Sequence, residues 1–321
     1  MAVRKAKAPS ASAAVRRGKA EAGAVFAIRA QKGRKRARAI AAARPARRRA
    51  RAAGPVRRAI PKRTLAAIGP QAPGVLIAEG DSWFDYPLND VLEALEDNHG
   101  FDVESVAHAG DNVEDMAYAG GQFEQFARRL EKLLRQERIP DAILISGGGN
   151  DLAGDEFVML LNHAASGLPA LNDDVVRGII DVRLANAYTF LISALTELSK
   201  QYLNRPIPIV IHGYAYPIPD GRGVLGGWGI LPGPWLRPSF HRKGHPDQDT
   251  NAKVMRQLID TFNAMLKRIS GTPGFAHVRY LDLRGELASD STYKKDWANE
   301  MHPTARGFAA VAAKFAAAIK Q

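Results

Sequence analysis

Short apolar runs alternate with helical patterns along the chain from residue 64 onward. A helical pattern shows apolar residues at intervals of three and four positions, and Phe123, Phe126, Leu130, Leu133 and Leu134 lie on one helix face in this way. Strands that alternate with helices predict βαβ units around a parallel sheet. We therefore expect an α/β fold, a three-layer α/β/α sandwich with about five parallel strands. The runs interpreted as strands are 75–78, 103–107, 142–146, 207–211 and 278–281.

Three more helices are expected, at about 174–202, at 251–269 and at the end of the chain, where Phe308, Val311, Phe315 and Ile319 keep helical spacing. Two stretches do not fit this alternation. Residues 153–173 form a short polar excursion after the third strand. Residues 212–250 are rich in glycine, proline and tryptophan and are much longer than an ordinary connection. Since long loops are usually functional, we expect residues 212–250 to form a lid or wall of a substrate site.

Charge divides the chain into two unequal parts. Residues 1–63 contain 21 of the 45 lysines and arginines and one acid, Glu21, which gives this segment a charge of +20. The remainder has 24 basic and 32 acidic residues, a charge of −8. We expect a disordered basic arm over 1–63 and one globular domain over 64–321. Such an arm would bind polyanions, either nucleic acid or anionic lipid, without reading sequence.

Composition also excludes several classes of protein. Without cysteine there are no disulfides and no thiolate metal ligands. No run approaches the roughly 18 apolar residues of a membrane helix, so we expect no transmembrane segment and no Sec signal peptide. A cytoplasmic location is favoured, although the arginine-rich, acid-poor N-terminus leaves an organellar transit peptide open. No motif for a cofactor is present, and none is expected.

Reactive groups follow the ends of the predicted strands. The carboxyl ends of parallel strands meet at one edge of a sheet, and ligands bind there in open α/β folds. A hydroxyl, an imidazole, glycine amides and a side-chain amide at this edge are what acyl transfer needs. Taken alone, Ser82 is explained better as the cap of the next helix than as a nucleophile. The four blocks are Gly80-Asp81-Ser82, His108-Ala109-Gly110, Gly148-Gly149-Asn150-Asp151 and Asn299-Glu300-Met301-His302.

The order and spacing of these four blocks resemble those of the SGNH (GDSL-type) hydrolases, over about residues 74–320. The resemblance implies the flavodoxin-like SGNH hydrolase fold and hydrolysis of a carboxylic ester, whether small, lipid or carbohydrate, through an acyl-enzyme. It implies Ser82 as nucleophile and His302 as general base. The oxyanion hole would consist of the backbone N–H groups of Ser82 and Gly110 and the side-chain amide of Asn150. The glycine would let its amide approach a ligand closely.

One position departs from the family pattern. The pattern has an aspartate three residues before the histidine, and this chain has Asn299. We expect Asn299 to orient His302, with Glu300 as the next candidate, and a neutral orienter to lower turnover. Pro303 fits the first position of the last helix, which would place His302 at the N-terminus of that helix. Possible substrate contacts are Asp81, His212, Tyr214 and Trp228.

Two other readings remain open. A metal-dependent phosphoesterase could recruit Asp81, Asp111, Asn150, Asp151, His108, His212 and His302 as ligands. The histidine that would follow Asn150 in a GNHD-type motif is absent, so no metal site is expected. Alternatively, the domain could be a catalytically weakened scaffold whose basic arm binds polyanions.

Overall fold

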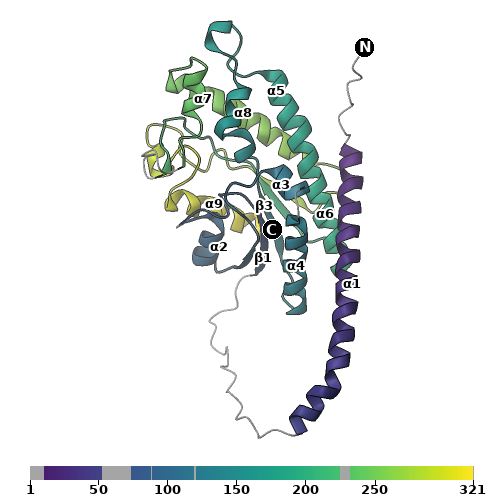
Figure 1. The fold of residues 1–321 in the computed structure, drawn as a ribbon. Helices are drawn as coiled ribbons and strands as arrows, with labels where there is room; N and C mark the ends of the chain where they lie inside the picture. The colour runs from purple at the N-terminus through teal and green to yellow at the C-terminus, as the bar shows by residue number, and fades with distance from the viewer. Residues whose placement is uncertain (1–10, 53–73, 88, 119–120, 225–231, 321) are drawn as a thin grey trace, which may run out of the picture.

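The computed structural model describes residues 11–52, 74–87, 89–118, 121–224 and 232–320 (Figure 1). A sheet of five parallel strands lies at its centre, in the order β2-β1-β3-β4-β5. This order is that of flavodoxin-like folds and confirms the predicted fold class. The strands are β1 (Val75–Gly80), β2 (Asp102–Ser105), β3 (Ala142–Ser146), β4 (Ile209–His212) and β5 (Val278–Leu281).

Burial explains where the strands lie. The central strand β3 is buried at every position, as expected of a parallel strand covered on both faces. The bounds of β3 and β5 match the prediction, whereas β2 ends two residues earlier and β4 begins two residues later. The first strand continues to Gly80, so Ser82 lies two residues beyond its carboxyl end.

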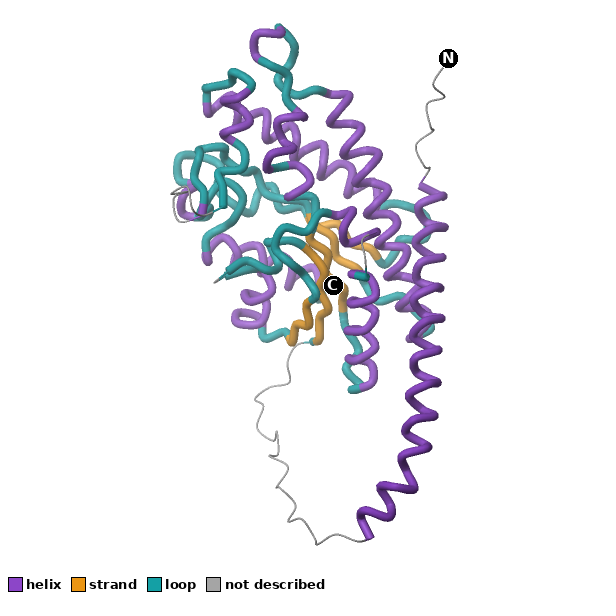
Figure 2. Tube along the Cα trace, viewed as in Figure 1, coloured by secondary structure: helices purple, strands orange, loops and turns teal. Residues whose placement is uncertain are grey.

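Helices cover both faces of the sheet (Figures 1 and 2). Helices α2 (Val91–His99) and α9 (Ala305–Ile319) pack against each other on one face. On the other face lie α3 (Val113–Tyr118), α4 (Gln122–Arg135) and α6 (Ala185–Leu203), with α8 (Gln248–Ser270) packed on α6 and β5. The helix α4 buries Phe123, Phe126, Leu130 and Leu133, as its pattern predicts.

The helix predicted at 174–202 consists of three parts. It begins as α5 (Asp173–Arg177), continues through a π-helical segment, Gly178–Leu184, and ends as α6. By length and composition the stretch Asp173–Leu203 could cross a membrane, although the sequence led us to expect no such stretch. Most of it is buried inside the fold, as in the core helix of a globular domain.

The two excursions contain short helical turns. Residues 153–173 contain the 3₁₀ segments Gly154–Leu160 and Ala164–Ser166. The excursion 212–250 follows β4 and contains α7 (Arg237–Arg242) and the start of α8. Further 3₁₀ turns lie at Asn150–Leu152 and Tyr293–Lys295.

A long helix, α1 (Ala11–Ala52), lies where a disordered arm was expected, and its first half packs along α6 (Figure 1). Alanine-rich sequence favours helix. The small residues Ala14, Gly18 and Ala22 are buried at four-residue spacing, which lets the two helices approach closely. The guanidinium of Arg17 stacks over the rings of Tyr118 and Phe190. The rest of the predicted arm, residues 1–10 and 53–63, lies outside the described residues.

Candidate active site

Ser82 lies in a tight turn that Asp81 holds in place. The Asp81 N–H donates to the carbonyl oxygen of Ser146 on β3 (3.1 Å). One oxygen of the Asp81 carboxylate accepts from the Trp83 N–H (3.0 Å) and the Ser146 hydroxyl (2.7 Å), and the other accepts from the hydroxyl of Tyr214. Asp81 is only 1% exposed. The expectation that Asp81 contacts substrate is therefore corrected, because this carboxylate is buried and both its oxygens accept hydrogen bonds that hold the turn.

The Ser82 hydroxyl contacts the imidazole of His302, which lies 220 residues later in the sequence. The distance between Ser82 Oγ and His302 Nε2 is 2.8 Å. Burial lowers the pKa of His302 to about 3, so the imidazole is neutral near pH 7 and can accept a proton. The capping role that Ser82 could have had belongs to Asp90, whose side chain accepts from the Glu93 N–H at the start of α2. The side chains of Ser82 and His302 thus form the contact that a nucleophile and its base require.

His302 lies three residues before the first residue of the last helix, and not directly before it as predicted. The cap of α9 is Thr304, whose hydroxyl accepts from the Gly307 N–H (3.2 Å). Pro303 pairs instead with Trp297 in an isolated antiparallel bridge. The prediction that Pro303 opens the helix is wrong, because the capping hydroxyl of Thr304 fixes the start two residues later, at Ala305.

Asn299, the predicted orienter, contacts the imidazole of His302. Its Oδ1 accepts from His302 Nδ1 (3.1 Å) and from the backbone N–H groups of Met301 (2.9 Å) and His302 (2.8 Å). Because both backbone groups can only donate, the amide oxygen must face them. Nδ1 of His302 therefore carries the proton, and the lone pair of Nε2 is directed at Ser82. This is the tautomer that a general base needs.

Glu300, the second candidate orienter, serves another purpose. Its side chain is fully buried, and its two oxygens accept four backbone N–H groups of the 212–250 excursion. Burial raises the pKa of Glu300, and these four hydrogen bonds act against that rise. The carboxylate thus ties the excursion to the loop that bears His302. The four donors are Gly221 (2.8 Å), Trp235 (2.7 Å), Leu236 (2.8 Å) and Arg237 (3.1 Å).

Two hydrogen bonds join the loops that contain Gly110 and Asn150, two of the predicted oxyanion donors. The Asn150 side-chain amide donates to the carbonyl oxygen of Asp111 (2.9 Å), and Asp151 Oδ2 accepts from the Val113 N–H (3.0 Å). These bonds join the loop after β3 to the loop after β2, which contains Gly110. A Cβ at Gly110 would meet no atom within 4 Å, but its φ is +96°. The backbone conformation by itself therefore favours glycine here.

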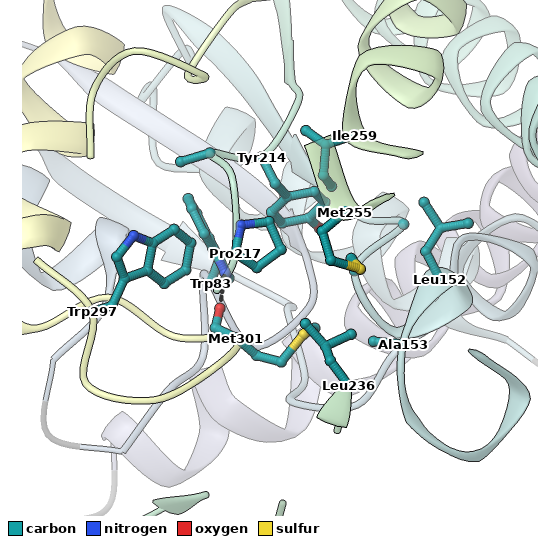
Figure 3. Close-up of a pocket in the computed structure, with 13 residues that line it drawn as sticks. Trp83, Leu152, Ala153, Tyr214, Pro217, Leu236, Met255, Ile259, Trp297 and Met301 are labelled. Carbon is teal, nitrogen blue, oxygen red and sulfur yellow. Dashed lines mark hydrogen bonds between the residues drawn. The ribbon is translucent and has the colours of Figure 1, made fainter. Parts of the chain in front are cut away.

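An apolar pocket lies beside this machinery (Figure 3). Three of its lining residues are immediate neighbours of site residues in sequence: Trp83 follows Ser82, Gly149 precedes Asn150, and Met301 precedes His302. The 212–250 excursion and α8 supply other walls, and the 3₁₀ turn after β3 closes one end. The remaining lining residues are Gly148, Leu152, Ala153, Tyr214, Ala215, Pro217, Leu236, Met255, Ile259 and Trp297.

The other three predicted contacts fall in different places. The ring of Tyr214 lines the pocket, although its hydroxyl is bound to Asp81. His212 is fully buried and packs against the rings of Trp83, Phe84, Tyr214 and Phe315. The expectation that His212 contacts substrate is corrected, because this residue belongs to the aromatic core behind the pocket. Trp228 lies outside the described residues.

The residues named for a metal site do not gather into one. Within the part of the chain that the structure describes, no group of three or more His, Asp or Glu side chains is arranged to hold a metal ion. Asp81 and His212 are turned into the core. Asp151 faces the first turn of α3 instead.

The sequence did not indicate three aromatic residues of the site. Tyr86 stacks on His302, Trp235 packs edge-on against the same ring, and the indole N–H of Trp83 donates to the carbonyl of Met301 (3.0 Å). Trp83 and Tyr86 lie within four residues of Ser82, and that proximity was the one available signal. Their partners, Met301 and His302, are more than 200 residues away in sequence and could not be read from spacing.

A search of curated proteins gave no match. Among solved structures, LAE5, an alpha/beta hydrolase enzyme from the metagenome of Lake Arreo, Spain, is 14% identical with a TM-score of 0.39 and covers 78% of this chain and 96% of its own. A catalytic mutant of Axe2, an acetylxylan esterase from Geobacillus stearothermophilus, is 15% identical with a TM-score of 0.39 and covers 78% and 95%. We draw no conclusion about activity from these two.

The family model for the GDSL-like lipase/acylhydrolase family matches residues 67–310, which is most of the chain and includes all four blocks of the site. This chain therefore belongs to the GDSL-like lipase/acylhydrolase family.

Proposed function

We propose that this protein is a serine hydrolase of carboxylic esters, with Ser82 as nucleophile, His302 as general base and Asn299 as the group that orients the base. Membership of a lipase/acylhydrolase family supports ester hydrolysis in general. The observation that carries the specific assignment is the 2.8 Å contact between Ser82 Oγ and His302 Nε2.

The reaction proceeds in two transfers. His302 Nε2 takes the hydroxyl proton while Ser82 Oγ attacks the ester carbonyl carbon, and the imidazolium keeps its Nδ1–H on Asn299 Oδ1. The N–H groups of Ser82 and Gly110 and the Asn150 amide stabilise the negative oxygen of the tetrahedral intermediate. The alcohol leaves with the proton from Nε2. Water then attacks the acyl-enzyme by the same steps and releases the acid.

The apolar pocket supports a substrate with an apolar acyl or alcohol group. Its walls include Trp83, Trp297 and Met301, and it lies beside the Ser82 turn and the His302 loop. An apolar group bound in this pocket would be removed from contact with water, which favours binding. The 212–250 excursion, anchored by Glu300, forms one wall and is proposed as part of the substrate site.

Chromogenic esters of acetate, butyrate and octanoate, with wild type, Ser82→Ala and His302→Ala, test this function. We expect hydrolysis by wild type, a loss of at least about a thousandfold in both variants, and labelling of wild type but not Ser82→Ala by a fluorophosphonate. Circular dichroism should show that the variants fold. Hydrolysis that survives in Ser82→Ala and is lost with a chelator would favour the metal-dependent phosphoesterase.

We further propose that residues 1–63 bind polyanions, an activity separate from catalysis. The charge of +20 on this segment, against −8 on the rest, supports this. Deletion of residues 1–63 should abolish binding to duplex DNA and to anionic vesicles while ester hydrolysis persists. Loss of hydrolysis on deletion would show that the division at residue 63 is misplaced. Unchanged binding would refute the role of the arm.

A further inference from the structure

The proposed mechanism requires His302 to carry a positive charge that its surroundings oppose. Burial is the cause that lowers the pKa of this histidine to about 3. The residue that contacts Nδ1, Asn299, is neutral and adds no compensating charge. The adjacent carboxylate, Glu300, is committed to four backbone donors of the excursion. Some other group must therefore stabilise the imidazolium.

The ring of Tyr86 lies face to face with that imidazole. The two ring centroids are 4.0 Å apart and the ring planes differ by 15°. The face of an aromatic ring carries partial negative charge and attracts a cation placed over it, more strongly where water is excluded. His302 is 6% exposed, so the contact is largely dry.

Resting on the function proposed above, we propose that Tyr86 is a positioning residue whose ring face stabilises the His302 imidazolium in place of the missing carboxylate. The interaction is weak while the imidazole is neutral and strengthens when Nε2 takes the serine proton. It therefore favours the transition state over the resting state, which is the condition for raising kcat.

A second contact of the same side chain sets the direction of the orienting amide. The hydroxyl oxygen of Tyr86 accepts from Asn299 Nδ2 (3.1 Å), while Asn299 Oδ1 faces Nδ1 of His302. Burial raises the pKa of Tyr86, so its hydroxyl stays protonated and neutral at working pH. One side chain thus contacts both the base and its orienter. An aspartate at 299 would need neither the ring of Tyr86 to stabilise the imidazolium nor its hydroxyl to set the direction of the side chain. Both oxygens of an aspartate accept hydrogen bonds, and its carboxylate carries the negative charge itself.

A double-mutant cycle tests the compensation directly. Tyr86→Leu should lower kcat by about tenfold to thirtyfold with little change in KM. In an Asn299→Asp background, which should itself be faster than wild type, the same substitution should cost less than about threefold, because the carboxylate takes over the charge. Equal losses in the two backgrounds would show that the ring merely packs.

A packing control accompanies the cycle. Phe308 lies 6.2 Å from the Tyr86 ring and also contacts Trp83, and the structure gives it no ring contact with His302. Phe308→Leu should therefore lower the melting temperature and alter kcat by the same factor in both backgrounds. A background-dependent effect of Phe308→Leu equal to that of Tyr86→Leu would overturn the assignment to Tyr86.

Fluorinated phenylalanines at position 86 give an independent measurement. Progressive fluorination weakens the negative face of the ring with little change of shape. Starting from Tyr86→Phe, we expect kcat to fall stepwise with each added fluorine while KM and the melting temperature stay level. A flat series overturns the proposal even if Asn299→Asp is inactive. Fluorophosphonate labelling of Ser82 in every variant separates this failure from failure of the proposed function.

Discussion

The indole Nε1 of Trp83 donates to the carbonyl oxygen of Met301 at 3.0 Å. One of these residues follows the nucleophile and the other precedes the base, so this single bond ties the two loops that must meet. Trp83 is buried and packs against Tyr214, Trp297 and Phe308. The distance between Ser82 and His302 thus depends on an indole that has no chemical role of its own.

Trp83→Phe should keep the aromatic packing and remove the bond. The Met301 carbonyl then loses a partner, which typically costs about 1–3 kcal/mol. We expect a lower melting temperature and a fall in kcat larger than any change in KM. Thermal unfolding and single-turnover kinetics measure the two effects. Unchanged turnover would show that the loops keep their spacing without this bond.

The acid side of the pH profile should extend unusually far. Because the folded pKa of His302 is lowered to about 3, its imidazole remains a competent base well below the ordinary value near 6.5. We expect kcat/KM to hold its plateau to about pH 4. The same shift works against the fold: the stability that neutral His302 contributes is complete above pH 6.5 and is lost as pH falls toward 3. Assays after return to pH 7 separate reversible titration from unfolding.

Asp151 should make stability depend on pH in the opposite direction. Burial raises its pKa to about 7, with the Val113 hydrogen bond acting against that rise. A carboxyl whose folded pKa exceeds its unfolded value contributes stability below about pH 4 that is lost as pH rises through about 7. Asp151→Asn should reduce the dependence of the melting temperature on pH between about pH 4 and about pH 8. An identical pH slope in the variant would assign the dependence to other groups.

Glu300→Gln tests whether this residue anchors the excursion or orients the base. The variant leaves a neutral amide facing four donors, so we expect a loss of stability of about 3 kcal/mol and faster proteolysis within 212–250. Activity per folded molecule at low temperature should change little compared with Asn299→Ala. A sharp fall in kcat without loss of stability would instead assign Glu300 to His302.

Gly18 offers a test of how α1 is held. A Cβ at this position would lie 2.3 Å from the carbonyl oxygen of Phe190 and 2.9 Å from Cβ of Ser193. Gly18→Val should therefore detach the first half of α1 from α6 and expose its arginines to trypsin, with ester hydrolysis unchanged. Gly23→Ala is the matched control, since nothing lies within 4 Å of a Cβ there. Equal trypsin resistance of the two variants would contradict this packing.

The sequence was most informative where one residue type permits few alternatives. The apolar runs predicted all five strands to within two residues. The reason is plainest for β1, β3 and β4, because strands buried on both faces need continuous apolar sequence. The order of the motifs predicted, before the structure was known, that Ser82, His302 and Asn299 lie close together. Side-chain direction was less predictable. Asp81 and His212 point into the core, where Asp81 binds Tyr214 and His212 packs on Trp83, and both partners lie far away in the chain.

The helix α1 shows a different limit. Its charge suggested an extended solvated arm, whereas its small residues at 14, 18 and 22 match the surface of α6. Such a match becomes visible only when both helices are known. Tyr86 escaped notice for the same reason, since its importance comes from partners 213 and 216 residues away.

The separation of 220 residues between Ser82 and His302 also bears on how activity is gained during folding. The turn that contains Ser82, the proposed nucleophile, directly follows the first strand. The proposed base His302, its proposed orienter Asn299 and Glu300 all lie in the last segment of the chain. Closing so long a loop is entropically expensive and late. In a refolding experiment, esterase activity should return after the bulk of helix and strand signals, which makes catalysis a reporter of the final docking of α9 rather than of collapse.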